Sequence, residues 1–164
     1  MGEGTRAPPR LWKETVLPEW LDYNGHLNEA YYVLIFSHAT DAFMAEIGLD
    51  PTSEERKVNS LYTLETHLCY LDECKAGDRV EVAIRLLGFD TKRYHCFHEM
   101  FLGGSDRLLA TAEIVLLHVD MSGPRSAPFP EPVRAKLEAL WRMHRDLPAP
   151  PQLNGAMGLK RPGA

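Results

Sequence analysis

A helix that is apolar almost all round sets the strongest limit on how this chain can fold. A surface helix normally carries one apolar stripe and a polar opposite face. Here apolar side chains fill nearly every position of the first two turns and continue at helical spacing: Ala30, Tyr31, Tyr32, Val33, Leu34, Ile35, Phe36, Ala39, Phe43, Met44 and Ile47. Such a helix would expose too much apolar surface if it lay in solvent. We therefore expect other parts of the structure to wrap around it.

A polar turn, residues 22–28, leads directly into this helix. Asn24 and Gly25 tolerate positive φ angles and favour a tight bend, and Asn28 is suited to capping the helix that follows. The bend would bring the Asp22 carboxylate to the helix N-terminus, where backbone N–H groups are free and the helix dipole is positive. A carboxylate beside such donors can act on a polarised carbonyl group. The turn is therefore a candidate active site.

Four segments after the helix have the patterns of β-strands: 60–71, 79–87, 92–102 and 108–119. The second of them alternates, with one face formed by Val80, Val82, Ile84 and Leu86 and the other carrying Glu81 and Arg85. Another strand, 12–17, precedes the turn, and a C-terminal helix is predicted over residues 131–146 with Pro132 in its first turn. This order predicts an α+β fold, a curved antiparallel β-sheet wrapped around one long central helix.

The turn motif, Asp22-x-x-Gly25-His26-x-Asn28 followed by a tyrosine-rich helix, resembles the signature of hotdog-fold acyl-CoA thioesterases of the 4-hydroxybenzoyl-CoA thioesterase type. The resemblance implies the hotdog fold, an acyl-CoA substrate, no cofactor, and active sites that lie between two subunits. It therefore implies a homodimer or homotetramer. A single hotdog subunit would also leave an edge strand exposed, which favours assembly.

Further blocks, within residues 12–148, are similar to one branch of this family. These blocks are Leu64-Glu65-Thr66-His67 with Gly77-Asp78, Lys92-Arg93-x-His95, Ala110-Thr111-Ala112-Glu113 and His118-Val119-Asp120. They resemble the thioesterase domain that is attached to, or encoded beside, bacterial L-carnitine dehydrogenases. This resemblance implies betainyl-CoA, in carnitine breakdown, as the substrate.

The candidate catalytic residues are Asp22, His26, Asn28 and Glu29. Asp22 would either remove a proton from the attacking water or attack the thioester carbon itself; its ordinary alternative is a turn residue that binds its own backbone. A main-chain N–H at Glu29 or Ala30 is expected to stabilise the oxyanion. His26 would position Asp22, contact the acyl group or brace the turn. Asn28 fits an N-cap better than a ligand contact.

The candidate substrate-binding residues are Tyr31, Tyr32, Glu65, Lys92 and Arg93. A trimethylammonium group has no N–H to donate and needs aromatic faces and a carboxylate. The side chains available for it are Tyr31, Tyr32, Phe36, Trp20, Tyr62 and Glu65. The CoA phosphates need basic side chains, for which the candidates are Lys92, Arg93, Arg125, Lys160 and Arg161. The ordinary alternatives are core packing for the aromatic residues and solvated turn charges for the basic ones.

Composition and spacing argue against several other classes of protein. A net charge of −5 disfavours nucleic-acid binding, and no apolar run approaches the ~20 residues of a membrane span. With no signal peptide recognised, we expect a cytoplasmic location. The three cysteines lack CxxC spacing and predict neither a disulfide framework nor a zinc site. His95 and His98, three apart on one strand, should point to opposite faces rather than share a metal ion.

We expect one domain, residues 11–147, between a flexible N-terminus, 1–10, and a Pro- and Gly-containing C-terminal tail, 148–164. Two other function classes fit the same fold. In a non-catalytic acyl-CoA-binding module, Asp22 would be only a turn residue. In a hydratase or dehydratase, a histidine and a carboxylate act at the α and β carbons, and the Asp22–His26 pair could imitate that arrangement. The thioesterase signature favours hydrolysis over both.

Overall fold

The computed structural model describes residues 7–159. Its elements are β1 (Arg10–Thr15), the 3₁₀ helix η1 (Pro18–Trp20), α1 (Glu29–Ile47), a second 3₁₀ helix η2 (Glu54–Lys57), β2 (Asn59–Tyr70), β3 (Arg79–Phe89), β4 (Arg93–Leu102), β5 (Leu108–Asp120), β6 (Arg125–Ser126) and α2 (Glu131–His144). The predicted order of one strand, one helix and four strands is confirmed. The short strand β6 is an addition.

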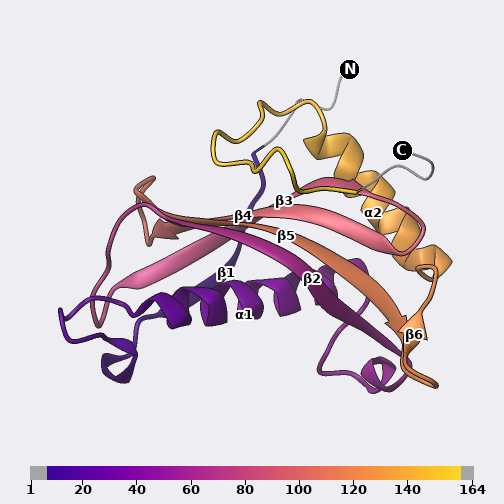
Figure 1. Cartoon of the computed structure of the whole chain (residues 1–164), viewed down its shortest axis with the longest axis horizontal. Helices are drawn as coiled ribbons and strands as arrows, with labels where there is room; N and C mark the ends of the chain where they lie inside the picture. The colour runs from indigo at the N-terminus through magenta and orange to yellow at the C-terminus, as the bar shows by residue number, and fades with distance from the viewer. Residues whose placement is uncertain (1–6, 160–164) are drawn as a thin grey trace.

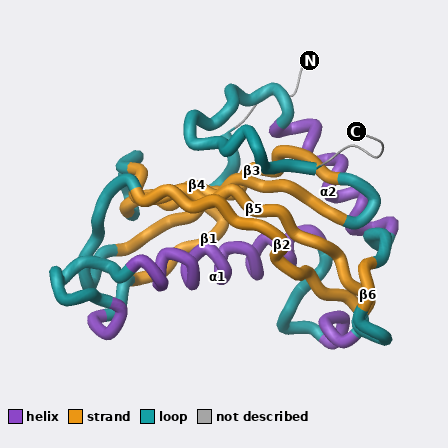
Figure 2. The backbone as a smooth tube through the Cα atoms, in the orientation of Figure 1, coloured by secondary structure: helices purple, strands orange, loops and turns teal. Residues whose placement is uncertain are grey.

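The strands form one antiparallel sheet in the order β1-β3-β4-β5-β2, and β6 pairs with β5. Figures 1 and 2 show the sheet curving over α1, which runs across its concave side. The first turns of α2 contact the C-terminal end of α1, where the Lys136 ammonium donates to the carbonyl of Glu46, and α2 runs beside β3. A curved antiparallel sheet around one long helix is the predicted hotdog fold. Strands β1 and β2 are its two edges.

The core lies between α1 and the concave face of the sheet. The alternation predicted in β3 is confirmed, because Val80, Val82, Ile84 and Leu86 all belong to the same buried cluster as Phe36 and Phe43 of α1. Burying a large apolar side chain contributes about 1.5–3 kcal/mol, so this layer holds α1 against the sheet. The N-terminus of α1 is thereby held in place beside the turn that carries Asp22.

Its own chain does not wrap α1 on every side. Val33 is 49% exposed and Leu34 is 37% exposed, so the expectation of a fully enclosed helix is wrong for a single chain. The physical reason is that one sheet covers only one side of a helix. The first two turns of α1 therefore carry an apolar stripe that nothing in residues 7–159 covers.

The segment that follows α2 covers part of the convex side of the sheet, and α2 itself lies beside the part of β3 that β1 leaves unpaired. β1 pairs with β3 only as far as Ala83, and beyond that point the N–H of Leu86 donates to Nδ1 of His144 in α2. The guanidinium of Arg85 donates to the carbonyls of His144, Leu147 and Pro148. The described part of the C-terminal tail thus lies against its own sheet (Figure 1).

Candidate active site

The turn that carries Asp22 is closed by backbone hydrogen bonds. The N–H of Asp22 donates to the carbonyl of His26 over 2.8 Å, and the N–H of Gly25 donates to the carbonyl of Asp22 over 3.0 Å. Gly25 has a φ of +79°, which a residue with a side chain rarely adopts. Leu21 and Leu27 form a β-bridge on either side of the bend. The turn therefore holds Asp22 in a defined position.

The two carboxylate oxygens of Asp22 have different surroundings. Oδ1 accepts the N–H of Asn24 over 2.8 Å and the N–H of His26 over 3.3 Å. Oδ2 has no hydrogen-bond or ion-pair partner within the described residues. One oxygen thus fulfils the ordinary turn role that the sequence allowed as an alternative. The other remains free for chemistry.

Among residues 7–159, one backbone N–H at the N-terminus of α1 has no hydrogen-bond partner. The side chain of Asn28 accepts the N–H of Ala30 over 3.0 Å, which confirms the predicted N-cap. Its backbone is held as well, because the Asn28 N–H donates to the carbonyl of Trp20 over 2.9 Å. The cap occupies the Ala30 N–H, whereas the Glu29 N–H has no partner in the part of the chain that the structure describes. Of the two predicted oxyanion donors, Glu29 is the one left available.

Two hollows meet at Asp22 and Glu29. The larger has a volume of 370 Å³, and its other lining residues are Leu27, Tyr32, Tyr70, Leu71, Asp72 and Glu73. The second has a volume of 360 Å³ and is lined also by Tyr23, Asn24 and Asn28. The Tyr70 hydroxyl donates to the carbonyl of Glu29 over 3.2 Å, so the end of β2 is tied to the start of α1. A substrate carbonyl placed there would have both a carboxylate oxygen and a free N–H beside it.

The ring of His26 points toward Glu73 rather than toward Asp22. Its Nε2 lies 3.7 Å from Oε1 of Glu73, and both hydrogen bonds between His26 and Asp22 involve the backbone of His26 rather than its ring. This geometry matches the bracing role among the three that the sequence left open. Asp22 and His26 do not form a side-chain pair, as a hydratase-like arrangement would require.

Acidic side chains surround the larger hollow. Asp72 forms an ion pair with Arg107, with Oδ2 2.6 Å from Nε, and the hydrogen bonds from Arg107 lower the Asp72 pKa to about 2. Glu29 and Glu73 add two more carboxyl groups to the same lining. The Tyr32 hydroxyl donates to the carbonyl of Asp72 over 3.1 Å, and burial raises the Tyr32 pKa well above its ordinary value. The hollow therefore combines negative charge with neutral tyrosine hydroxyls.

Cys74 and Cys96 are poor nucleophiles. Burial raises the pKa of the Cys74 thiol to about 11, and the Cys96 pKa is raised further by complete burial. A thiolate is the reactive form of cysteine, so both thiols are inert near neutral pH. Cys74 lines neither hollow at Asp22. Its sulfur lies 4.0 Å from the hydroxyl oxygen of Tyr32.

The predicted substrate-binding residues do not all gather at this site. Tyr32 lines the larger hollow, and Tyr31 stacks on Trp20 with ring centroids 5.3 Å apart. Glu65 pairs with Val115 of β5. The neighbours of Val115 on that strand, Ile114 and Leu116, face the core, so Val115 and Glu65 lie on the convex side of the sheet, away from α1. The single chain therefore does not place Glu65 beside Asp22.

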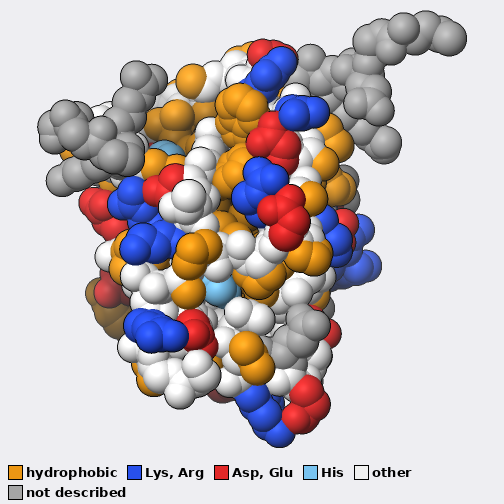
Figure 3. Space-filling view, turned by 90° about the vertical axis from the view of Figure 1, so that its right-hand side faces the viewer, with side chains coloured by type: hydrophobic (Ala, Val, Ile, Leu, Met, Phe, Trp, Pro, Cys, Tyr) orange, Lys and Arg blue, Asp and Glu red, His pale blue; other side chains and the backbone are white. Residues whose placement is uncertain are grey.

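Lys92 and Arg93 lie at the opposite end of the sheet from Asp22. Arg93 pairs with Leu117 near the end of β5, whereas Leu71, beside the hollow, bonds to Leu109 near its start. Arg93 forms an ion pair with Asp90, and the Lys92 ammonium donates to the hydroxyl of Ser126. On the end of the molecule shown in Figure 3, basic side chains lie next to acidic ones. Lys160 and Arg161, the other phosphate-binding candidates, lie outside the described residues.

The histidines of β4 diverge as the strand period predicts. Nε2 of His95 lies 2.8 Å from the Glu113 carboxylate on the convex side, while His98 packs against Phe36 on the concave side. Within residues 7–159 no group of three or more His, Cys, Asp or Glu side chains could hold a metal ion.

Sequence reasoning missed Tyr70, Asp72 and Glu73. These residues reach Asp22 because the Leu27 N–H donates to the carbonyl of Cys74 over 2.9 Å, which joins two segments far apart in the chain. The Tyr70 hydroxyl adds the second link. The sequence showed only that Asp72 and Glu73 follow a predicted strand. It did not show that this loop would contact the turn that carries Asp22.

Comparison with known proteins places this geometry in a family. A family model described as the thioesterase-like superfamily matches residues 16–137. The betainyl-CoA thioesterase of Pseudomonas aeruginosa is 53% identical over 148 residues, which are 90% of this chain and 93% of that protein. The L-carnitine dehydrogenase/betainyl-CoA thioesterase of Rhizobium meliloti is 38% identical over 94% of this chain. The match covers only 31% of that longer protein.

A solved structure supports the same fold assignment. A Staphylococcus aureus protein in complex with CoA is 28% identical and superposes with a TM-score of 0.79. The alignment covers 91% of this chain and 94% of the other. Within residues 7–159 the structure contains no helix long and apolar enough to cross a membrane.

Proposed function

This chain belongs to the thioesterase-like superfamily and is an acyl-CoA thioesterase, and we propose that it hydrolyses betainyl-CoA to betaine and free CoA. The observation that carries the proposed chemistry is that Asp22 and Glu29 line the same hollows, with Oδ2 of Asp22 and the Glu29 N–H both without a partner among residues 7–159. The substrate named for the 53% identical relative supports the choice of acyl group.

In the proposed mechanism, the Glu29 N–H donates to the thioester oxygen as negative charge develops on it. A fixed backbone donor at a positive helix end stabilises that charge without reorganisation. The Asp22 carboxylate then acts in one of two ways. It removes a proton from the water that attacks the carbonyl carbon, or it attacks that carbon to form an anhydride that water cleaves. In both routes the thiolate of CoA leaves and takes a proton.

The acidic lining of the larger hollow suits a cationic acyl group. A trimethylammonium group cannot donate a hydrogen bond, so it is held by negative charge and aromatic faces. Glu29 and Glu73 supply charge, and Tyr32 and Tyr70 supply rings within the same lining. The mouth of the site thus provides both requirements without Glu65.

We also propose that the active unit is a homodimer that pairs through β2. This edge strand exposes Tyr62 and Leu64, and the uncovered Val33 and Leu34 of α1 lie on the free side of the helix. A hollow of 260 Å³ opens between α1 and β2, lined in part by Ser37, Thr40, Thr63 and Thr66. A second copy paired along β2 would cover this hollow. It would also bring residues such as Glu65, Lys92 and Arg93 closer to the partner's site.

We keep the cytoplasm as the proposed location. Cys69, Cys74 and Cys96 are all free thiols in the structure, which suits a reducing compartment.

Thiol release from a panel of acyl-CoAs tests the proposed substrate. We expect betainyl-CoA to be hydrolysed with a higher kcat/KM than 3,3-dimethylbutyryl-CoA, whose tert-butyl group is the uncharged isostere of trimethylammonium. A desolvated cation–π contact of about 2 kcal/mol corresponds to roughly 30-fold if it is realised in the transition state. Equal kcat/KM for the two esters would remove the betaine assignment. Binding of CoA esters without thiol release would instead indicate a binding module.

A further inference from the structure

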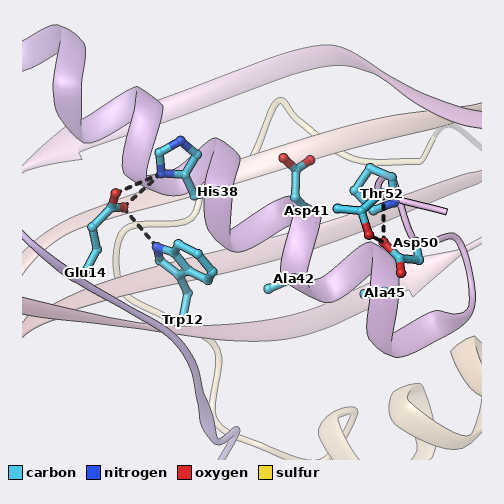
Figure 4. A pocket seen from close by; sticks show the side chains of 9 residues that line it. Trp12, Glu14, His38, Asp41, Ala42, Ala45, Asp50 and Thr52 are labelled. Atoms are coloured by element: carbon cyan, nitrogen blue, oxygen red, sulfur yellow. Dashed lines mark hydrogen bonds and ion pairs between the residues drawn. The ribbon is translucent and has the colours of Figure 1, made fainter.

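A further cavity lies along the side of α1 that faces β1. Its volume is 490 Å³, and its lining residues are Trp12, Glu14, His38, Asp41, Ala42, Ala45, Asp50, Pro51 and Thr52. Figure 4 shows the two strand residues and His38 at one end, Asp50 and Thr52 at the other, and Asp41 of α1 between them. None of these residues lines the hollows at Asp22.

The cavity is well separated from the candidate active site. His38 and Asp41 lie ten and thirteen residues after Asn28 on the same helix, and an α-helix rises about 1.5 Å per residue, so they lie about 15–20 Å further along it. A ligand in this cavity would not reach Asp22. The cavity therefore needs an explanation of its own.

One end of the cavity is a fixed hydrogen-bonded cluster. The carboxylate of Glu14 accepts the indole N–H of Trp12 over 2.9 Å, and its Oε2 also lies 2.9 Å from Nδ1 of His38. The rings of Trp12 and His38 meet edge to face, with centroids 5.8 Å apart. These contacts orient the indole, so the aromatic wall of the cavity is already in position before any ligand binds.

Asp41 supplies a carboxylate that the protein itself does not use. It has no hydrogen bond or ion pair among the described residues, whereas Asp50 is occupied by the N–H and hydroxyl of Thr52, both within 2.8 Å. Within residues 7–159 no lysine or arginine lines the cavity. Asp41 is exposed, so its carboxylate is accessible to a cationic ligand.

The lining favours an organic cation over a metal ion. The three carboxylates are spread along the cavity, and no set of metal-ligating side chains within residues 7–159 is close enough to hold a metal ion. Between them, Ala42 and Ala45 leave space and an apolar wall next to the indole. Methylated ammonium groups are attracted by an aromatic ring together with nearby negative charge.

We propose that this cavity is a second, non-catalytic binding site for a small quaternary ammonium compound. The ligand carries no carboxylate of its own, because Glu14, Asp41 and Asp50 would repel one. Its positive head lies between the indole of Trp12 and the carboxylate of Asp41. This inference does not depend on the acyl group that the active site hydrolyses.

Isothermal titration calorimetry with choline as the probe tests the proposal on the intact chain. We expect choline to bind at least about tenfold more tightly than 3,3-dimethylbutan-1-ol, its uncharged isostere, because the cation–π and charge contributions are lost in the alcohol. Glycine betaine, which carries a carboxylate, is expected to bind more weakly than choline. Equal affinity for choline and the alcohol, or no binding of choline at millimolar concentration, would overturn the proposal.

Four variants locate the site. Asp41→Asn is expected to weaken choline binding severalfold, and Ala45→Leu is expected to abolish it by filling the cavity without a change of charge. Glu46→Gln, at an exposed carboxylate of α1 outside the cavity lining, is the matched control and should bind like the parent protein. Asp22→Asn should also retain binding. Loss of choline binding in Asp22→Asn, with Asp41→Asn unaffected, would place the probe in the active site and contradict the proposal.

Discussion

At the scale of single residues, the two carboxylate oxygens of Asp22 have different roles. Oδ1 of Asp22 holds the turn together through the N–H groups of Asn24 and His26, while Oδ2 is free at the mouth of α1. The structural and the catalytic interpretations of Asp22 are therefore compatible. They can be separated because asparagine retains an acceptor oxygen for the turn and loses the negative charge.

We expect Asp22→Asn to keep the fold and to lower thioester hydrolysis by at least ~10²-fold, the scale of losing a general base. The measurement is kcat from thiol release, with circular dichroism to check the fold. Glu46→Gln, at an exposed carboxylate of α1 that lines neither hollow at Asp22, is the control and should change kcat little. Near-normal turnover by a folded Asp22→Asn protein would show that Asp22 is only a turn residue.

A second residue-scale prediction concerns His98, which is fully buried and has no partner at Nδ1. Burial lowers its pKa from 6.5 to about 3, so it stays neutral in the folded chain while the unfolded chain takes up a proton below pH 6.5. The unfolded state then binds more protons, and stability falls as the pH falls. Each pH unit below the unfolded pKa costs about 1.4 kcal/mol for such a group.

Urea denaturation at pH 7 and at about pH 5.5, above most carboxyl pKa values, measures this effect. We expect the parent chain to lose more stability than His98→Leu over that interval. The burial that lowers the pKa of His144 adds a smaller loss in both proteins. Identical losses in the parent and the variant would mean that His98 takes up its proton in the folded state.

At the scale of elements, α1 is the part on which the site depends. Its buried side joins the sheet, and its N-terminus carries both the Asn28 cap and the free Glu29 N–H. Packing in the middle of the helix therefore fixes the position of the oxyanion donor at its end. The apolar residues that predicted a wrapped helix lie on two sides of α1. One side packs on the sheet, and the other side, with Val33 and Leu34, is exposed.

Phe36→Ala is expected to destabilise the fold by about 3–5 kcal/mol, the usual cost of truncating a buried aromatic residue. Phe36 is 2% exposed and packs against His98, so the truncation leaves a cavity between α1 and β4. The shift of the denaturation midpoint measures the effect. Val58→Ala, at a side chain that is 54% exposed, is the control and should stay within about 0.5 kcal/mol of the parent. An unchanged midpoint for Phe36→Ala would contradict the observed packing.

At the scale of the whole molecule, the open side of α1 and the edge strand β2 belong to one surface. An edge strand of this length with exposed Tyr62 and Leu64 is a template for pairing with another strand. Pairing there would cover apolar side chains of both elements at once. It would also explain why a chain that resembles hotdog thioesterases keeps an apolar helix face open to solvent.

We expect the chain to sediment as a dimer at micromolar concentration, and Leu64→Lys to shift it toward the monomer. Like charges placed across a two-fold axis repel each other and carry a desolvation cost. Leu17→Lys, at an exposed leucine that follows β1, is the matched control and should remain dimeric. A parent chain that sediments as a monomer, or a Leu64→Lys variant with an unchanged sedimentation coefficient, would contradict pairing through β2.

Much of the fold was readable from local chemistry. The Asn28 cap and the positive φ of Gly25 were predicted because caps and tight bends depend on a few neighbouring residues. The start of α1 at Glu29 follows from the predicted Asn28 cap, whereas α2 ended two residues before the predicted end, at His144. The alternation in β3 identified its core face because the side-chain period of a strand is fixed by the backbone.

The surroundings of those elements were not readable in this way. Tyr70 and Glu73 meet Asp22, and Trp12 meets His38, only because strand pairing brings distant segments together. The convex placement of Glu65 follows from the register of β2 against β5, which includes a shift between Thr63 and Glu65. A one-residue change of register turns a side chain to the other face, and no local pattern records it. The residue types that carry the chemistry were therefore predictable, whereas their neighbours depended on long-range pairing.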